Sequence, residues 1–228
     1  MYMNRNEAEV TLGRQAEFEA LIDELSAIQS QNAGFVAATL LQAYANPGRF
    51  TLFSRWTDRE AWVVAARREQ FTRFAEKLRN SGTLRPTRLT ESYESVFEVD
   101  QPNVSAAASS AERWIDLTVN GPTAAPAVEA HLRTVAELGL EHARGVLSVR
   151  LRRSMGDDRK YLLLVITTGR DAARAWPLVP QVRERIESNS INQYLVGLPT
   201  SEIHHVVKRY AGPALSMAQA TAAAAAAR

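Results

Sequence analysis

The hydrophobic and polar positions of this 228-residue chain follow the same order in its two halves. In the first half, a short strand predicted over residues 8–12 precedes apolar residues at helical spacing, namely Phe18, Leu21, Ile22, Leu25 and Ile28. In the second half, a strand predicted over 114–119 precedes a less regular series, Val128, Leu132, Val135, Leu138 and Leu140. Spacings of three and four residues put apolar side chains on one helix face. Each half therefore begins with a strand and an amphipathic helix.

Two strands joined by a tight turn are predicted next in each half. In the first half an alternating run follows Gly34, and residues 46–48 (Asn-Pro-Gly) separate it from a strand over 50–56. In the second half the run follows Gly145, and residues 156–158 (Gly-Asp-Asp) precede a strand over 161–167. These runs are rich in β-branched and aromatic residues and are bounded by turn formers, which is typical of β-hairpins.

The two halves keep a constant register. Gly34 and Gly145, Phe50 and Tyr161, and Ala61 and Ala172 are each 111 residues apart. A register without gaps over almost thirty residues, with matching turns, indicates an internal duplication.

A second helix and a last strand complete each half. The sequence Thr57-Asp58-Arg59-Glu60 fits a capping box with Thr57 as the N-cap, and the helix is expected to run to about Arg79. In the second half Pro177 and Pro180 should kink or split the helix, because proline lacks the amide donor. The last strands are predicted over 93–99 and 202–209.

The predicted order is βαββαβ, twice, which is an α+β fold of two tandem ferredoxin-like modules. We expect the first module over residues 1–100, a Ser-, Ala- and Pro-containing linker over 101–112, a second and degenerate module over 113–212, and a disordered Ala-rich tail over 213–228.

Composition removes several classes of function. The 27 basic and 25 acidic residues are interspersed and leave a net charge of +2, so no nucleic-acid partner is expected. Cysteine is absent, which excludes thiolate nucleophiles, disulfides and Cys-ligated metals. No apolar run is long enough to span a membrane, and the N-terminus has no signal-peptide pattern. We therefore expect a cytoplasmic protein without a membrane partner.

Several residues of the first half resemble the antibiotic biosynthesis monooxygenase family. They are Gly34-Phe35, Arg49-Phe50, the run from Arg55 to Ala61 with its Trp-Thr-Asp, and Phe71. The match covers about residues 8–99 and extends by duplication to about 113–210. The family consists of dimeric α+β barrel proteins, so a tandem copy implies two modules that form an intrachain dimeric α+β barrel. Angucycline ring-opening oxygenases also look like two-domain members of this family.

The resemblance implies an oxygenase that acts on an aromatic polyketide in antibiotic biosynthesis, by hydroxylation, quinone formation or oxidative ring opening. Its partners would be an aromatic small molecule and dioxygen. No tightly bound cofactor is expected. Reduced flavin (FADH2 or FMNH2) as a diffusing co-substrate, supplied by a separate flavin reductase, stays open, as does a homodimer. The chain has no G-x-G-x-x-G motif for a bound dinucleotide.

The family's site residues carry over in part. Trp56 falls where anthrone oxygenases of the family place a pocket Trp, Trp62 falls where they place a Tyr, and Leu52 replaces an Asn. Glu76 stands near the family's helical Arg, with Arg73 close by. In the haem-degrading relatives a Trp and a His fall on about Ala65 and Ala75 here, which counts against haem degradation. In the second half Thr167 and Ala173 replace the two tryptophans.

The candidates are assigned two roles. The catalytic set is Trp56, Trp62, His204 and Arg73, with a His as general base or an Arg as the partner of a phenolate. The substrate-binding set is Phe53, Arg55, Phe71, Phe74, Tyr93, His131, Trp176 and His205. His204 and His205 are neighbours on a strand and point to opposite faces, and no spacing fits metal ligands, so no metal is expected.

Each candidate also has a plainer interpretation. The aromatic residues are equally typical of core packing, and the arginines and histidines of solvated or satisfied positions. Two other functions stay open: a non-catalytic ligand-binding or interaction protein, and a polyketide cyclase with an acid–base pair. A cavity with a few converging polar groups would favour an enzyme, and a filled core would favour the plainer interpretation.

Overall fold

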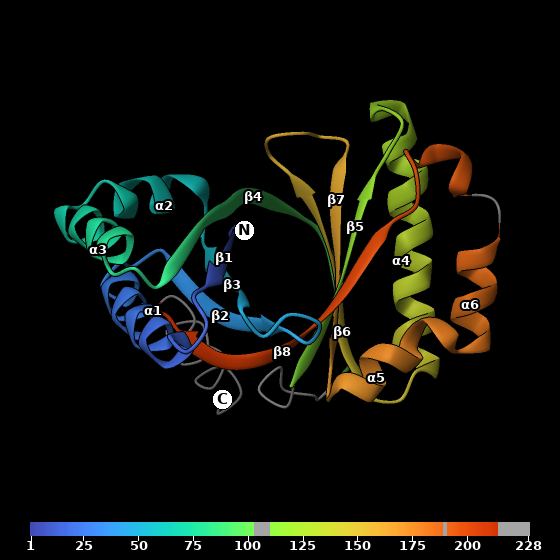
Figure 1. Cartoon of the computed structure of the whole chain (residues 1–228). Coiled ribbons are helices and arrows are strands. Elements are labelled where there is room, and N and C mark those ends of the chain that lie inside the picture. Colours follow the sequence, from blue (N-terminus) through green and yellow to red (C-terminus); the bar gives the residue numbers. More distant parts are fainter. Residues whose placement is uncertain (103–109, 189–190, 214–228) are drawn as a thin grey trace, which may run out of the picture. The chain divides into compact units, whose positions relative to one another are not determined.

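The computed structural model describes residues 1–102, 110–188 and 191–213. The first half contains β1 (Tyr2–Val10), α1 (Gln15–Ser30), β2 (Phe35–Ala43), β3 (Arg49–Trp56), α2 (Arg59–Ala66), α3 (Glu69–Asn80) and β4 (Leu84–Asp100). The second half contains β5 (Ala111–Thr118), α4 (Ala125–His142), β6 (Val146–Ser154), β7 (Lys160–Thr167), α5 (Arg170–Ala175), α6 (Pro180–Glu187) and β8 (Thr200–Ala211). Each half thus has the predicted order, with its second helix in two pieces (Figure 1).

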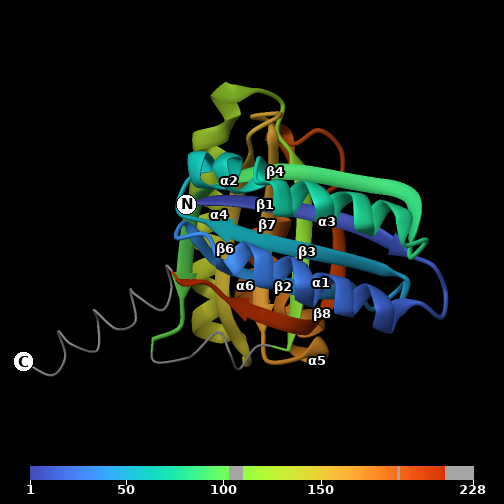
Figure 2. The same ribbon diagram turned by 90° about the vertical axis from the view of Figure 1, so that its left-hand side faces the viewer.

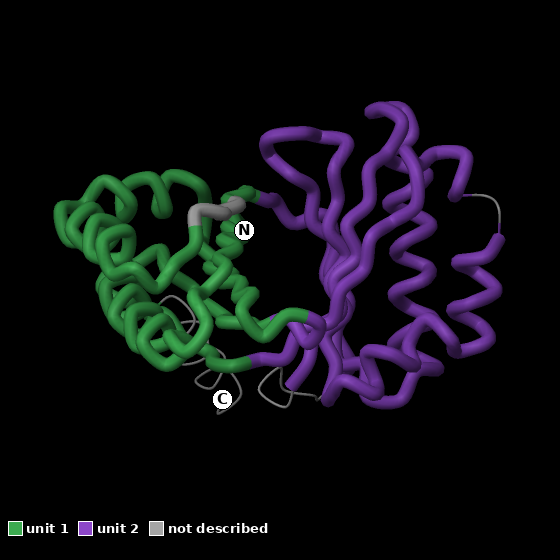
Figure 3. Tube along the Cα trace, viewed as in Figure 1, with its two compact units in different colours: residues 1–42, 46–92, 207–228 green, residues 43–45, 93–206 purple. Residues whose placement is uncertain are grey.

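The chain divides into two compact units that share two long strands. Unit 1 comprises Met1–Gln42, Asn46–Ser92 and the C-terminal residues from Val207 on, and unit 2 comprises Ala43–Ala45 and Tyr93–Val206 (Figure 3). The unit boundary therefore falls inside β4 and inside β8. Most of the linker predicted at 101–112, and all but the first residue of the tail predicted at 213–228, lie outside the described residues.

The strand order is β1-β3-β2-β8-β5-β7-β6-β4, that of a closed barrel. The neighbouring pairs β1–β3, β2–β3, β5–β7 and β6–β7 are all antiparallel. This order confirms the predicted α+β fold of two ferredoxin-like modules joined as an intrachain α+β barrel.

The helices of unit 1 cover one face of its strands, and α1 and α3 run beside each other across β1 and β3 (Figure 2). The buried residues between the layers include Phe18, Ile22, Leu40, Phe50 and Trp56. Unit 2 is built in the same way from α4, α5 and α6, and its core includes Val128, Leu132, Val149, Leu163 and Trp176. Each unit thus buries the helix face that its sequence pattern predicts.

The duplicated glycines make the same contact in both modules. A Cβ on Gly34 would overlap Ala61, and a Cβ on Gly145 would crowd Thr168 and Ala172. The amide of Thr57 donates to the carbonyl of Gly34 at 2.9 Å, and the amide of Thr168 donates to that of Gly145 at 2.8 Å. The 111-residue register therefore marks a close approach of the strand end to the following helix, which a side chain at either glycine would obstruct.

Four strands differ from their predicted bounds by more than one residue. The first strand covers Tyr2–Val10 instead of residues 8–12. Polar residues lie on both of its faces, so the alternation of apolar and polar positions that predicts a strand is interrupted. The other first strand covers Ala111–Thr118 instead of 114–119. The last strands, Leu84–Asp100 and Thr200–Ala211, are longer than predicted and continue from one unit into the other.

The N-cap of the second helix is Asp58, and the prediction of Thr57 was wrong. Asp58 has extended backbone angles, and its carboxylate accepts a hydrogen bond from the amide of Ala61 at 2.8 Å. The hydroxyl of Thr57 donates to the same carboxylate at 3.0 Å. These two bonds, the Ala61 amide first, hold the pKa of Asp58 below its usual value.

The helix after this cap ends at Ala66 and does not continue to Arg79 as predicted. Arg68 takes an extended conformation and starts α3. Neither proline nor glycine marks the break. Its consequence is geometric: Trp62 and Phe71 are nine residues apart, or two and a half turns, and would face opposite ways in one continuous helix. Splitting the helix lets both side chains face the sheet. The split predicted from Pro177 and Pro180 in the second module is confirmed.

No helix in the described part of the chain combines the length and the apolar character needed to cross a membrane.

Candidate functional site

Unit 1 contains a cavity of about 170 Å³ between its helices and its sheet. Its apolar wall comes from all three helices: Phe18, Ile22 and Leu25 of α1, Trp62 of α2, and Phe71, Phe74 and Leu78 of α3. The α1 residues follow the i, i+4, i+7 spacing of one helix face. The ring of Trp62 lies 5.6 Å from that of Tyr2 on β1. The wall is therefore aromatic on the side where α2 and α3 meet.

The sheet side of the cavity is polar. Asn4 and Asn6 of β1 line it together with Ser54 of β3 and Thr90 of β4. The hydroxyl of Ser92 donates to Oδ1 of Asn4 at 2.9 Å, and that of Thr90 donates to Oδ1 of Asn6 at 3.1 Å. These bonds fix both amide groups in position. We call Asn4, Asn6, Ser54 and Thr90 the polar floor.

Gln29, a residue that the sequence analysis missed, lines the cavity from the end of α1. It is 2% exposed, and its Oε1 atom has no hydrogen-bond partner in the described part of the chain. Gln29 lies four residues after Leu25, so it continues the apolar stripe as a polar residue. Its helical spacing from Leu25 could have identified Gln29 as a buried position, but a pattern defined by apolar residues does not include a glutamine.

The cavity brings together three predicted site residues, Trp62, Phe71 and Phe74. Trp56 is not among the lining residues. It is fully buried, packs edge-on against Phe35 at 5.2 Å, and donates from Nε1 to Oγ of Ser54 at 3.3 Å. Trp56 therefore affects the site only indirectly, by donating a hydrogen bond to the Ser54 hydroxyl of the polar floor.

Phe53, Arg55 and Arg73 lie away from the cavity. On β3 the lining residues are Leu52 and Ser54, so Phe53 and Arg55 point to the opposite face of the strand. Arg73 is exposed on α3 and pairs with Glu69 at 2.5 Å. A side chain in this position makes an ordinary helix-surface ion pair.

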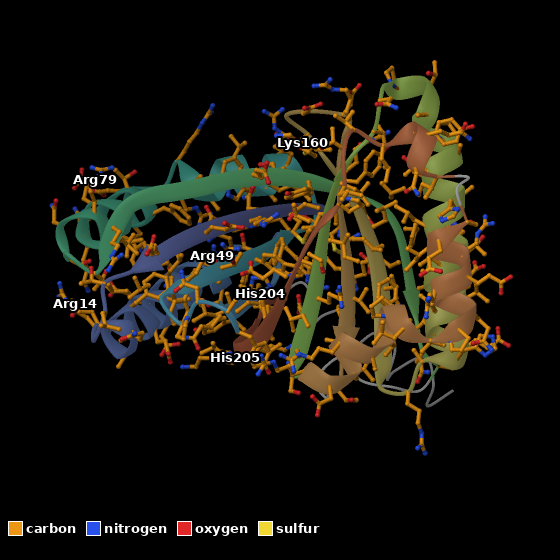
Figure 4. The ribbon with its side chains drawn as sticks, turned by 45° about the vertical axis from the view of Figure 1, so that its right-hand side comes forward. Arg14, Arg49, Arg79, Lys160, His204 and His205 are labelled. Carbon is orange, nitrogen blue, oxygen red and sulfur yellow. The ribbon has the colours of Figure 1, made fainter. Side chains whose placement is uncertain are left out.

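The two histidines of β8 belong to unit 2 and face opposite ways, as strand neighbours should (Figure 4). His204 is buried, its ring lies 4.0 Å from that of Trp114, and its Nε2 is 3.1 Å from a carboxylate oxygen of Glu202. The ring of His205 lies 5.5 Å from that of Tyr44 in a tilted arrangement.

The remaining candidates, Tyr93, His131 and Trp176, are buried in unit 2. Burial, and then the positive charge of Arg185, lower the pKa of His131. Trp176 packs over Gly139 so closely that a Cβ there would overlap its indole nitrogen. Tyr93 lies on β4, where it pairs with Ser154 of β6.

Glu7 is the one charged residue among the described residues that line the cavity, and its carboxylate forms an ion pair with Arg5. Across the described residues, no group of three His, Cys, Asp or Glu side chains is placed to hold a metal ion. The arrangement suits a planar, largely apolar molecule that carries one or two polar groups on its edge.

Comparison with known proteins gives a family for the first part of the chain. Residues 1–77 match the family model described as antibiotic biosynthesis monooxygenase. No curated protein matches the chain.

Solved structures share the fold of the whole chain. A proposed monooxygenase of Fusobacterium nucleatum matches with a TM-score of 0.74 and 10% identity, over 92% of this chain and 94% of that one. A proposed monooxygenase of Lactobacillus acidophilus gives 0.70 and 8%, over 92% and 95%. An anthrone oxidase-like protein gives 0.66 and 12%, over 92% of each chain. At these identities the likeness is one of fold.

Proposed function

We propose that this chain, whose residues 1–77 match the antibiotic biosynthesis monooxygenase family model, oxygenates a hydroxylated aromatic compound in the cavity of unit 1. The observation that carries the proposal is the composition of that cavity, an aromatic wall of Trp62, Phe71 and Phe74 facing a polar floor. Such a site excludes water from a flat ring while hydrogen-bonding its substituents.

The proposed reaction uses a phenol, dioxygen and the residues that line the cavity. A phenol that has lost its proton passes one electron to dioxygen, and the resulting superoxide and phenoxyl radical combine into a carbon-bound peroxide. Loss of water from the peroxide gives a quinone. One phenol with a free ring position and one dioxygen thus yield one quinone and one water, so all four electrons come from the substrate. The protein holds the ring, fixes its edge and keeps bulk water out.

This route makes specific use of the residues present. Trp62 and Phe74 bracket the ring plane, and the amide and hydroxyl groups of Asn4, Asn6 and Ser54 contact the oxygen substituents. The described residues of the lining include no Lys or Arg for a phenolate. The proton is therefore lost according to the acidity of the substrate itself, and turnover should rise with pH through the pKa of the phenol chosen.

Reduced flavin does not fit the same space beside a substrate. Its three fused rings and an aromatic substrate together exceed about 170 Å³, and Glu7 has the same sign of charge as a flavin phosphate. The cofactor-free route is the one that the cavity supports. An aromatic polyketide from an antibiotic pathway is the substrate class that the family suggests.

The test is dioxygen consumption by the full chain. A polyphenol is incubated with the protein under anaerobic conditions, and oxygen is then admitted, with and without dihydroflavin. We expect uptake of one dioxygen per quinone formed, without hydrogen peroxide and without a need for dihydroflavin. Binding without oxygen uptake would instead favour a ligand-binding protein.

A matched pair of variants ties the activity to the cavity. Ala75 lines it from α3, and its neighbour Glu76 is exposed. Ala75→Phe should fill the cavity and abolish uptake, whereas Glu76→Phe adds the same side chain outside it and should keep activity. Equal activity of the two variants would remove the cavity of unit 1 from the proposal.

A further inference from the structure

Gln29 presents a buried hydrogen-bond acceptor to the cavity. Its side chain is 2% exposed, and Oε1 finds no donor in the described part of the chain. A buried acceptor left unmatched is destabilising, so such atoms are normally paired with protein, water or ligand. Because Gln29 lines the cavity, a molecule bound there can supply the donor that Oε1 lacks.

Three other acceptors around the cavity already have a donor. Oδ1 of Asn4 accepts from Ser92, and Oδ1 of Asn6 accepts from Thr90. The hydroxyl oxygen of Ser54 accepts from the indole of Trp56. Among the described lining residues, Oε1 of Gln29 is the amide oxygen without a donor, and a hydroxyl group on an aromatic ring can supply one.

In the second module, the position that corresponds to Gln29 is filled by packing. The six buried positions of α1 match six of the seven buried positions of α4 at a constant offset of 110 residues, so Gln29 of α1 corresponds to Gly139 of α4. In unit 2 the missing side chain leaves room for the indole of Trp176, which packs directly over Gly139. An aromatic group thus occupies this position in unit 2, whereas unit 1 has a buried amide beside a cavity.

The size of the cavity limits what the hydroxyl can be attached to. An apolar cavity of about 150 Å³ in another protein binds benzene, whereas pockets for larger ligands run to about 300–1,000 Å³. A volume of about 170 Å³ therefore suits one ring or two fused rings and is small for three or four.

We propose that the cavity of unit 1 selects one- or two-ring phenols, and that Gln29 positions them by accepting a hydrogen bond from the ring hydroxyl. The ring then lies along Phe18, Ile22 and Leu25 of α1, with its far edge toward the polar floor. This inference deepens the proposed function by naming its substrate class. It concerns binding, so it can be tested without oxygen.

The experiment compares 1-naphthol with 1-methylnaphthalene, which differ by a hydroxyl against a methyl group. Affinities are measured under anaerobic conditions by titration calorimetry for the wild-type chain, Gln29→Leu and the control Gln31→Leu. Gln31 is an exposed glutamine at the end of the same helix. We expect Gln29→Leu to shift the ratio of the two affinities by about tenfold against 1-naphthol, and Gln31→Leu to leave it unchanged. In the wild type, a three-ring phenol should bind at least tenfold more weakly than 1-naphthol.

An unchanged ratio in Gln29→Leu, or equal binding of the three-ring phenol, would overturn the inference. If Gln29→Leu does not fold, Gln29→Glu keeps an acceptor and should retain the preference for 1-naphthol over 1-methylnaphthalene. The proposed function fails separately: a protein that binds 1-naphthol through Gln29 but consumes no oxygen has the substrate class proposed here without the reaction.

Discussion

At the scale of single residues, two tryptophans six positions apart have different roles. Trp62 is half-buried and lines the cavity, whereas Trp56 is fully buried against Phe35 and reaches the site only through Ser54. The family resemblance placed both in the pocket. Removing atoms from a packed side chain lowers stability, and removing atoms from a cavity wall mainly changes the shape that a ligand meets.

We therefore predict opposite outcomes for the same substitution at these two positions. Trp62→Phe should lower oxygen uptake severalfold while changing the free energy of unfolding by less than about 1 kcal/mol. Trp56→Phe should cost about 1–3 kcal/mol of unfolding free energy, because it leaves a void and an unmatched Ser54 hydroxyl. Urea unfolding and the oxygen electrode measure the two quantities. Equal loss of both quantities in both variants would mean that both tryptophans serve packing alone.

At the scale of secondary-structure elements, the break between α2 and α3 creates the wall of the cavity. A continuous helix would turn Phe71 to the side opposite Trp62. The start of α2 is fixed by Asp58, whose carboxylate accepts a hydrogen bond from the Ala61 amide.

We predict that Asp58→Ala lowers the melting temperature more than Thr57→Ala does, because the carboxylate is the cap and the hydroxyl only supports it. The pKa of Asp58 is lowered in the folded chain, so its contribution is present above the unfolded value of about 4 and is lost as pH falls through the folded value. The gap in melting temperature between wild type and Asp58→Ala should therefore close below about pH 4. A gap that does not depend on pH would assign the effect to lost helix propensity elsewhere.

Among the buried positions that α1 and α4 share, one differs in a titratable side chain. His131 of α4 matches Leu21 of α1 in the series of buried residues. The pKa of His131 is lowered mainly by burial, so the unfolded chain binds its proton more readily. Stability should therefore fall as pH drops below the unfolded value of about 6.5.

We predict that His131→Leu, which restores the residue of the first module, flattens this dependence. Urea unfolding midpoints at pH 5 and pH 7 should differ less for the variant than for the wild type. His142, which is more exposed on the same helix, provides the control, and His142→Leu should keep the wild-type slope. A parallel slope for His131→Leu would show that other groups dominate the acid side.

The sequence predicted the fold more completely than it predicted the residues of the candidate site. The 111-residue register predicted both modules, since Gly34 and Gly145 are required by the same close contact. The first strand was predicted too short because Asn4 and Asn6 interrupt the apolar face of β1. Both residues belong to the polar floor. Gln29 was missed for the same reason. Polar residues at buried positions of a site contradict the pattern from which elements are predicted.

At the scale of the whole molecule, the two modules keep one fold and differ in what lies between helices and sheet. Unit 1 has a cavity with polar groups from four elements, whereas the matching place in unit 2 holds the indole of Trp176. Duplication allows this division, because one copy can retain a binding site while the other gains packing.

The last prediction separates these two roles. Trp176→Ala should cost about 3–5 kcal/mol of unfolding free energy, because the large side chain is fully buried over Gly139. Trp176 belongs to an apolar core cluster whose buried members include Val128, Val135 and Val182, so we expect apolar walls around the vacated space. It should therefore bind a small apolar ring such as benzene, which would raise the melting temperature of the variant and leave that of the wild type nearly unchanged. Oxygen uptake at a temperature where the variant is folded should persist, since the proposed reaction site is the cavity of unit 1. Loss of oxygen uptake in a folded Trp176→Ala chain would instead assign the reaction to the second module. The first module would then be the copy that serves packing.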